Sequence, residues 1–157
     1  MLYRRAFFAF LGPLGAGLRA FPVEEVPEFR GATIGGRKFT RASLKGTPVL
    51  IQFWATWCGV CRRDQPAVDA LVEEYGDRLT VLAVSVNESE RAVRKYLANS
   101  PRKGQIVLSE TTNLPAIFGA RAFPHYVLLD ADSRLKADVE GGIGGEGLRR
   151  LLKRVNL

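Results

Sequence analysis

The chain has 157 residues, of which 46% are hydrophobic and 25% charged, and its formal net charge is +7. This size fits one globular domain with a sizeable core, which needs no disulfide staple to fold. Arg4, Arg5 and Arg19 supply three of the positive charges and residues 1–20 contain no acid, so the rest of the chain carries +4. That modest, scattered charge does not form the basic and aromatic patch of a nucleic-acid surface, and nucleic acid is not an expected partner.

Residues 1–20 differ in composition from the rest of the chain. Two arginines precede the uncharged stretch Ala6 to Leu18, and the first acid is Glu24. A basic start followed by an apolar stretch too short to span a bilayer predicts an export signal peptide. An uncleaved membrane anchor and a buried N-terminal helix are the alternatives, and the arginine pair also resembles a twin-arginine signal. Any contact with a membrane is expected through this segment alone.

Residues 21–26 are predicted to form a linker, and residues 27–157 one domain. From there, strand-like and helix-like patterns alternate, which is typical of an α/β fold with a sheet covered on both faces. The predicted strands are 29–33 and 37–40, as a hairpin around Gly35-Gly36, then 49–54, 80–86, 105–108, 126–130 and 135–139. The predicted helices are 58–75, 89–99, 114–118 and 144–155.

Cys58 and Cys61 are the two cysteines of the chain. As a structural clip they would close a very short loop, which removes little chain entropy. As zinc ligands they would need further donors, and beyond scattered carboxylates the chain offers only His125. The remaining use is a pair that makes and breaks a disulfide, and no metal or other cofactor is expected.

The predicted position of Cys58 favours that redox use. It lies where a buried strand ends and a helix begins, with Cys61 one turn further along the helix. The free N–H groups and positive dipole end of a helix lower the pKa of a thiol placed there. We therefore expect Cys58 to be the exposed nucleophile and Cys61 the shielded resolving thiol, acting through a mixed disulfide.

The segment around these cysteines resembles the active-site segment of the thioredoxin superfamily, in particular its TlpA/ResA-like exported branch. The resemblance extends over about residues 26–157, and it rests on Ile51-Gln52-Phe53-Trp54-Ala55-Thr56-Trp57-Cys58-Gly59-Val60-Cys61-Arg62-Arg63, on Leu44-Lys45-Gly46, on Pro66 and on Gly119-Ala120-Arg121-Ala122-Phe123-Pro124. It implies a thioredoxin fold, with a central mixed sheet flanked by helices, an N-terminal β-hairpin and a short insertion.

The same resemblance implies a function and a location. Proteins of this branch exchange thiols and disulfides outside the cytoplasm, in the periplasm or on the outer face of the cytoplasmic membrane. Their partners are protein disulfide substrates, often apocytochrome c, and a membrane thiol transporter that supplies electrons. We expect these partners here, with the chain acting as a protein-disulfide reductase in cytochrome c maturation and cell redox homeostasis.

Three further residues are implicated in substrate binding. The family has a cis-proline at the position of Pro124, facing the cysteine pair, and the backbone of the preceding residue, here Phe123, pairs with bound substrate as an added strand. The alternatives are an ordinary trans proline and an apolar strand-edge residue. Trp57, next to the nucleophile, is expected to be a partly exposed platform, and Trp54 a core residue.

The sequence departs from the thioredoxin pattern at the position of a buried aspartate, where it has Gln52. No carboxylate is then available there to take the proton of Cys61. His125, directly after Pro124, is a candidate proton acceptor in its place, the alternative being a satisfied histidine within a strand. The dipeptide Gly59-Val60 does not fix the reduction potential, so the expectation of reduction over oxidation rests on the family.

Two other classes of function use similar residues. A thiol peroxidase would have a proline and a threonine where Ile51 and Ala55 stand. A copper or zinc carrier of the Sco type would use two thiols and one histidine, which this chain has, but with three residues between the cysteines instead of two.

Overall fold

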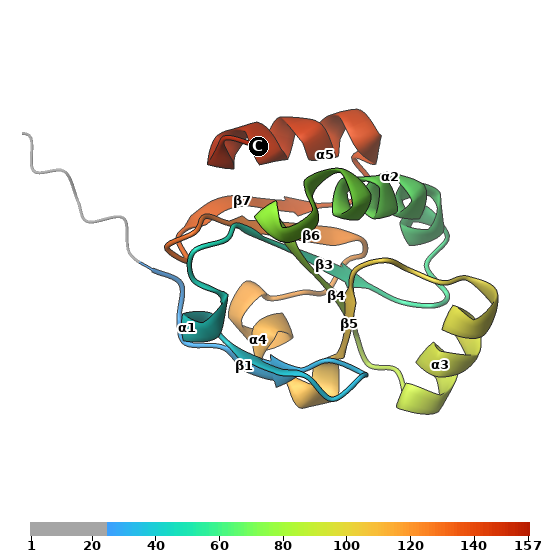
Figure 1. The fold of residues 1–157 in the computed structure, drawn as a ribbon. Coiled ribbons are helices and arrows are strands. Elements are labelled where there is room, and N and C mark those ends of the chain that lie inside the picture. The colour runs from blue at the N-terminus through green and yellow to red at the C-terminus, as the bar shows by residue number, and fades with distance from the viewer. Residues whose placement is uncertain (1–24) are drawn as a thin grey trace, which may run out of the picture.

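The structure is a computed structural model, and it describes residues 25–157 (Figure 1). The predicted export segment 1–20 and most of the predicted linker lie outside the described residues and stay predictions. Within 25–157, no helix combines the length and the apolar character needed to cross a bilayer. The described chain enters the fold at once, because Val26 is 7% exposed and its N–H donates to the carbonyl of Ser133.

A mixed sheet of five strands, in the order β5-β4-β3-β6-β7, forms the centre of the molecule. Its strands are β3 (Val49–Trp54), β4 (Thr80–Ser85), β5 (Gln105–Leu108), β6 (His125–Leu129) and β7 (Leu135–Glu140). β3, β4 and β5 run parallel, whereas β6 and β7 are antiparallel to their neighbours. Every residue of β3 and β6 is buried, which explains their nearly unbroken apolar sequences. The predicted central mixed sheet is confirmed.

Helices cover both faces of this sheet (Figure 1). α2 (Gly59–Tyr75) and α5 (Gly144–Leu152) pack on one face, where α3 (Glu90–Asn99) lies toward the β5 edge. On the other face lie α4 (Leu114–Phe118) and the hairpin of β1 (Arg30–Ala32) and β2 (Lys38–Thr40). The remaining helical turns are α1 (Arg41–Leu44), η1 (Gly76–Arg78), η2 (Ser109–Thr111) and η3 (Lys153–Val155).

The N-terminal hairpin is confirmed as well, with β1 and β2 antiparallel and Gly36 at a φ of +87° in its turn. The short helix α1 that follows was not predicted. It is held by a capping box, in which the Thr40 hydroxyl accepts from the N–H of Ser43 and the Ser43 hydroxyl accepts from the N–H of Thr40. Because α1 has four residues and none of them is buried, no apolar periodicity marks it in the sequence.

The core is divided by the sheet into two apolar layers. One contains Phe29, Phe53, Leu114 and Val127, and the other contains Leu50, Leu71, Leu128 and Leu148. Successive residues of a strand point to opposite faces, so β3 sends Ile51 and Phe53 to the first layer and Leu50, Gln52 and Trp54 to the second. Gln52 and Trp54 therefore lie on the face that α2 covers.

Candidate active site

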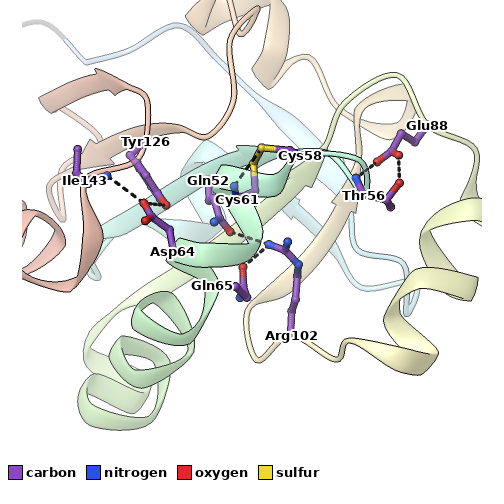
Figure 2. Close-up of a disulfide and its surroundings, with 10 residues drawn as sticks. All are labelled: Gln52, Thr56, Cys58, Cys61, Asp64, Gln65, Glu88, Arg102, Tyr126 and Ile143. Atoms are coloured by element: carbon purple, nitrogen blue, oxygen red, sulfur yellow. Dashed lines mark hydrogen bonds between the residues drawn. A yellow bond between two sulfur atoms is a disulfide. The ribbon is translucent and has the colours of Figure 1, made fainter.

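Cys58 and Cys61 lie at the start of α2, where the chain leaves the central strand β3, and they are joined by a disulfide with 5.3 Å between their Cα atoms (Figure 2). Cys58 is the N-cap residue of α2, with φ −79° and ψ 103°. Its Sγ accepts a hydrogen bond of 3.1 Å from the N–H of Cys61. In the reduced protein the same N–H and the positive end of a 17-residue helix favour a thiolate at Cys58.

The two sulfur-bearing residues differ in exposure, but less than expected. Cys58 is 5% exposed and Cys61 is 0% exposed, so the predicted order holds. The description of Cys58 as an exposed thiol is nevertheless wrong in degree, because the apolar cluster of Trp54, Ala55 and Leu108 encloses both cysteines. A partner must therefore approach Cys58 closely to reach its sulfur.

An aromatic surface adjoins the cysteine pair. Trp57 is 70% exposed, and its ring meets that of Phe123 edge-on at a centroid distance of 6.0 Å. The peptide bond between Phe123 and Pro124 is cis, as predicted. Trp54 is fully buried, as expected of a core residue. An exposed tryptophan beside a nearly buried nucleophile gives a partner chain an apolar surface on which to rest.

Glu88 fixes the loop that precedes Cys58, a contact that the sequence analysis missed. Its carboxylate accepts from the N–H of Thr56 at 2.9 Å and from the Thr56 hydroxyl (Figure 2). It also accepts from the Ser85 hydroxyl at 2.7 Å. The parallel pairing of β3 with β4 could have indicated it, because the carboxyl ends of neighbouring parallel strands meet at one edge of a sheet.

Asp64, one helical turn after Cys61, connects α2 to α5. One oxygen of its carboxylate accepts from the Tyr126 hydroxyl and from the N–H of Ile143, both at 3.0 Å (Figure 2). The same oxygen accepts from the N–H of Gly144 at 3.3 Å. Burial, and then the negative charge of Asp64, raises the pKa of Tyr126 far above its ordinary value. This contact orients the N-terminus of α5 against the active-site helix.

Gln52, which stands in place of the expected aspartate, is fully buried beneath α2. Its Oε1 lies 3.4 Å from a guanidinium nitrogen of Arg102, and the same nitrogen donates to Oε1 of Gln65. Arg102 follows α3, far from the cysteines in sequence, and no local pattern predicts that it folds back to this position.

The structure gives His125 a partner other than Cys61. Its Nε2 lies 2.6 Å from a carboxylate oxygen of Asp138, and its ring packs on that of Phe53 at 5.3 Å between centroids. Because His125 pairs with Phe53 across the sheet, both side chains leave on the face opposite α2. The hypothesis that His125 takes the proton of Cys61 is therefore corrected.

Metal binding and disulfide exchange make different demands on such a site. Among residues 25–157, no group of three or more His, Cys, Asp or Glu side chains is placed to hold a metal ion. A cysteine pair that forms a disulfide at a helix N-terminus, with an outer and an inner sulfur and an apolar surface beside it, can instead exchange that disulfide with a thiol. The fold and the site define a thiol-disulfide oxidoreductase.

The comparisons with known proteins agree with this class. A family model described as Redoxin matches residues 22–143, which is most of the chain, and the chain belongs to this family. Among solved structures, a thiol:disulfide interchange protein of the thioredoxin family from Chlorobium tepidum superposes with a TM-score of 0.72. It is 25% identical, with 83% of this chain and 94% of that chain covered. The fold is thus thioredoxin-like.

Two sequence relatives extend the comparison. The thioredoxin-like protein YneN of Bacillus subtilis is 34% identical over 110 residues, which are 68% of this chain and 64% of YneN. The chain thus spans slightly less than two thirds of that relative. The thiol-disulfide oxidoreductase ResA of Bacillus thuringiensis is 24% identical over 133 residues, which are 84% of this chain and 77% of ResA.

Proposed function

We propose that this protein works outside the cytoplasm and reduces disulfides of other proteins through its Cys58–Cys61 pair. The observation that carries the proposal is the position of that pair, with the less buried residue Cys58 at the helix N-terminus next to Trp57 and Cys61 fully buried. The basic and apolar composition of residues 1–20 supports export. The proposed substrates are apocytochrome c-type cysteine pairs, and the proposed electron donor is a membrane thiol transporter.

The reaction begins with the reduced protein. The Cys58 thiolate attacks a substrate disulfide, so a bond forms between Cys58 and one substrate sulfur while the other leaves as a thiolate and takes a proton from water. The Cys61 thiolate then attacks Cys58, which forms the Cys58–Cys61 disulfide and releases the second substrate sulfur with the electron pair. The substrate gains two electrons and two protons, and the protein's dithiol loses them.

The segment with the cis peptide bond between Phe123 and Pro124, directly before β6, provides the docking surface for the substrate chain. Phe123 is half-buried against Trp57, and Pro124 is buried at the start of the sheet. A substrate that adds its backbone beside Phe123 would bring its disulfide over Cys58, with its neighbouring side chains on the Trp57 ring. Hydrogen bonds to the substrate main chain would then provide affinity that depends little on the substrate's sequence.

Reduction of insulin disulfides tests the proposed reaction. With dithiothreitol as donor, catalytic amounts of the protein should accelerate insulin precipitation, and Cys58→Ala should abolish the acceleration because no nucleophile remains. With Cys61→Ala, the first attack still occurs and the insulin chain should stay attached as a covalent adduct that a reductant releases. A wild-type protein with no effect on insulin, at any ratio of donor to substrate, would contradict the proposal.

A fusion tests the proposed location independently. An enzyme reporter that is active only in the cytoplasm, joined after Leu157, should be inactive when residues 1–20 are present. The same fusion lacking residues 1–20 is the matched control and should be active. Full reporter activity in the first fusion would exclude export.

A further inference from the structure

Arg102 brings a positive charge beneath the redox pair. Its guanidinium carbon lies 3.6 Å from the ring centroid of Trp54, and the ring of Tyr96 is 5.8 Å away. As Figure 2 shows, the guanidinium points toward Gln52 and Gln65, to which one of its nitrogens donates. Stacking and hydrogen bonds together fix the group in one orientation, which is the use for which arginine is better suited than lysine.

Within residues 25–157, no carboxylate forms a direct ion pair with this guanidinium. Gln52 and Gln65 are neutral, and the Nε and Nη2 atoms of Arg102 are buried without a hydrogen-bond acceptor. The carboxylate of Asp69 attracts the guanidinium through space only, because it accepts hydrogen bonds from Gln65 at 2.7 Å and from the N–H of Lys103 at 2.9 Å. Burial lowers the pKa of Arg102, which nonetheless stays protonated at neutral pH. A half-buried cation without a direct ion pair costs stability, so its position beneath the redox pair calls for an explanation.

The position of the guanidinium relative to Cys61 explains why a charge lies there. Gln65 follows Cys61 by four residues on α2, so the two side chains lie on the same helix face, about one turn apart. Trp54, on which the guanidinium stacks, belongs to the same buried cluster as both cysteines. A positive charge in such a water-poor layer favours a negative charge that develops nearby more than it would in solvent.

We infer that Arg102, held by Gln52 and Gln65 against Trp54, is a positioning residue that favours the Cys61 thiolate electrostatically. The inference deepens the proposed exchange reaction and rests on it. In the resolving step the Cys61 thiolate attacks Cys58, the bond from Cys58 to the substrate sulfur breaks, and the electron pair leaves with that sulfur. Arg102 raises the fraction of Cys61 available as thiolate for this attack, in the place where Gln52 offers no carboxylate as base.

Other charged or titratable groups also surround the pair. These are Arg62 and Asp64 on α2, Glu88 after β4, Tyr96 on α3, Arg121 before Pro124 and Tyr126 on β6. The carboxylate of Asp64 is turned to Tyr126 and the start of α5, and that of Glu88 to Thr56 and Ser85. Arg62 is exposed, so water screens its charge. Arg102 differs from these groups in being a half-buried cation with no direct ion pair, and Asp69 attracts it only through space.

The test measures the titration of Cys61 in a Cys58→Ser background, as the rate of alkylation by iodoacetamide against pH. Arg102→Met keeps the packing on Trp54 and removes the charge. It should raise the pH midpoint of Cys61 alkylation by about one pH unit. Lys103→Met is the matched control, because it removes an equal charge from the next residue, whose side chain is 49% exposed and paired with Glu73. The control should leave the midpoint unchanged.

The resolving step itself gives a second readout. With both cysteines present, Ellman's reagent forms a mixed disulfide at Cys58, and attack by Cys61 then releases a second thionitrobenzoate. Arg102→Met should slow this release near neutral pH about threefold, since a tenfold smaller thiolate fraction is partly offset by the higher nucleophilicity of a more basic thiol. Arg102→Lys should recover part of the rate.

Gln65→Glu keeps the test decisive if Arg102→Met does not fold. A glutamate there would retain the hydrogen bond to Arg102 and neutralise its charge, and it should raise the Cys61 midpoint as well. Unchanged midpoints in the folded variants would overturn the inference, as would an equal shift in Lys103→Met. Failure of the proposed exchange reaction is distinguishable, because the wild-type protein would then leave insulin intact whatever the Cys61 midpoint.

Discussion

The two faces of the central sheet are both closed to solvent, yet they are filled differently. The face under α4 and the hairpin is packed with apolar side chains such as Phe29, Phe53 and Val127. The face under α2 has an apolar layer too, but near the cysteines it contains buried Gln52, Gln65 and Asp64 and the half-buried Arg102. The polar groups are concentrated at the end of the sheet where the disulfide lies.

The apolar face stabilises the fold, whereas the polar groups under α2 affect the chemistry of the cysteine pair. Apolar burial stabilises a domain, whereas a buried polar atom without a partner costs free energy. Unpartnered atoms occur beneath the redox pair on Gln52, Trp54 and Arg102. On the other face, the polar side chain of His125 pairs with Asp138, although its Nδ1 has no partner. We therefore expect substitutions on the two faces to affect different measurements.

The largest effect on activity is expected from the nucleophile. Cys58→Ala should eliminate insulin reduction entirely, because the remaining buried thiol cannot reach a substrate disulfide. Urea denaturation of the reduced proteins should show a loss of about 1 kcal/mol, because alanine cannot accept the N-cap hydrogen bond at the start of α2. Residual turnover above that of a denatured control would place the nucleophile elsewhere.

The largest effect on stability is expected from the apolar face. Phe53→Ala should lower the free energy of unfolding by about 3–5 kcal/mol, because Phe53 is fully buried and a cavity would replace its ring. Urea denaturation measures the loss. In the same protein the pH midpoint of Cys61 should be unchanged, and a shift comparable to that of Arg102→Met would erase the distinction between the faces.

Tyr126→Phe should have a smaller effect that depends on pH. At neutral pH it should cost about 1–3 kcal/mol, because Asp64 loses a hydrogen bond in a buried position. The pKa of Tyr126 is raised in the folded protein, so its contribution is complete below about pH 10, where the unfolded tyrosine also stays protonated, and is lost above it. Urea denaturation at neutral and alkaline pH should therefore show the gap between the two proteins closing. A gap that widens would contradict this assignment.

The smallest effect on exchange is expected from His125→Thr. The side chain points away from α2, so the release of thionitrobenzoate should keep its rate and its pH dependence between about pH 6 and pH 8. Stability should fall by about 2 kcal/mol, because the buried ring of His125 packs on Phe53 and its removal leaves a cavity, in addition to the lost contact with Asp138. A slower resolving step in this variant alone would restore His125 as a proton acceptor.

Local patterns in the sequence were sufficient for the strands and for the position of the cysteine pair. β3 is an apolar run that ends at Trp54, and the helix that follows begins at Gly59 with Cys58 as its N-cap, within one residue of the predicted start. Cis-Pro124 was predictable from the resemblance alone, because the residues themselves fit a trans proline equally well. The i, i+3 spacing of Cys61 and Asp64 on one helix could have drawn attention to that carboxylate.

The contacts that fix the polar layer could not be predicted in this way. Arg102 reaches Gln52 from 50 residues away in sequence, and it does so from a loop whose path depends on the packing of α3. His125 was assigned to the wrong face because its nearness to Pro124 in sequence was taken as nearness to Cys61. The pairing of His125 with Phe53, which decides the face, follows only from the register of β6 on β3.

The central claim is that Cys58 attacks and Cys61 resolves. Labelling the reduced protein with a limiting amount of iodoacetamide, followed by peptide mass spectrometry, tests it most directly. The account predicts that Cys58 is alkylated first across neutral pH, because Cys58 is the less buried residue and caps the positive end of α2. Alkylation of Cys61 before Cys58 would contradict it.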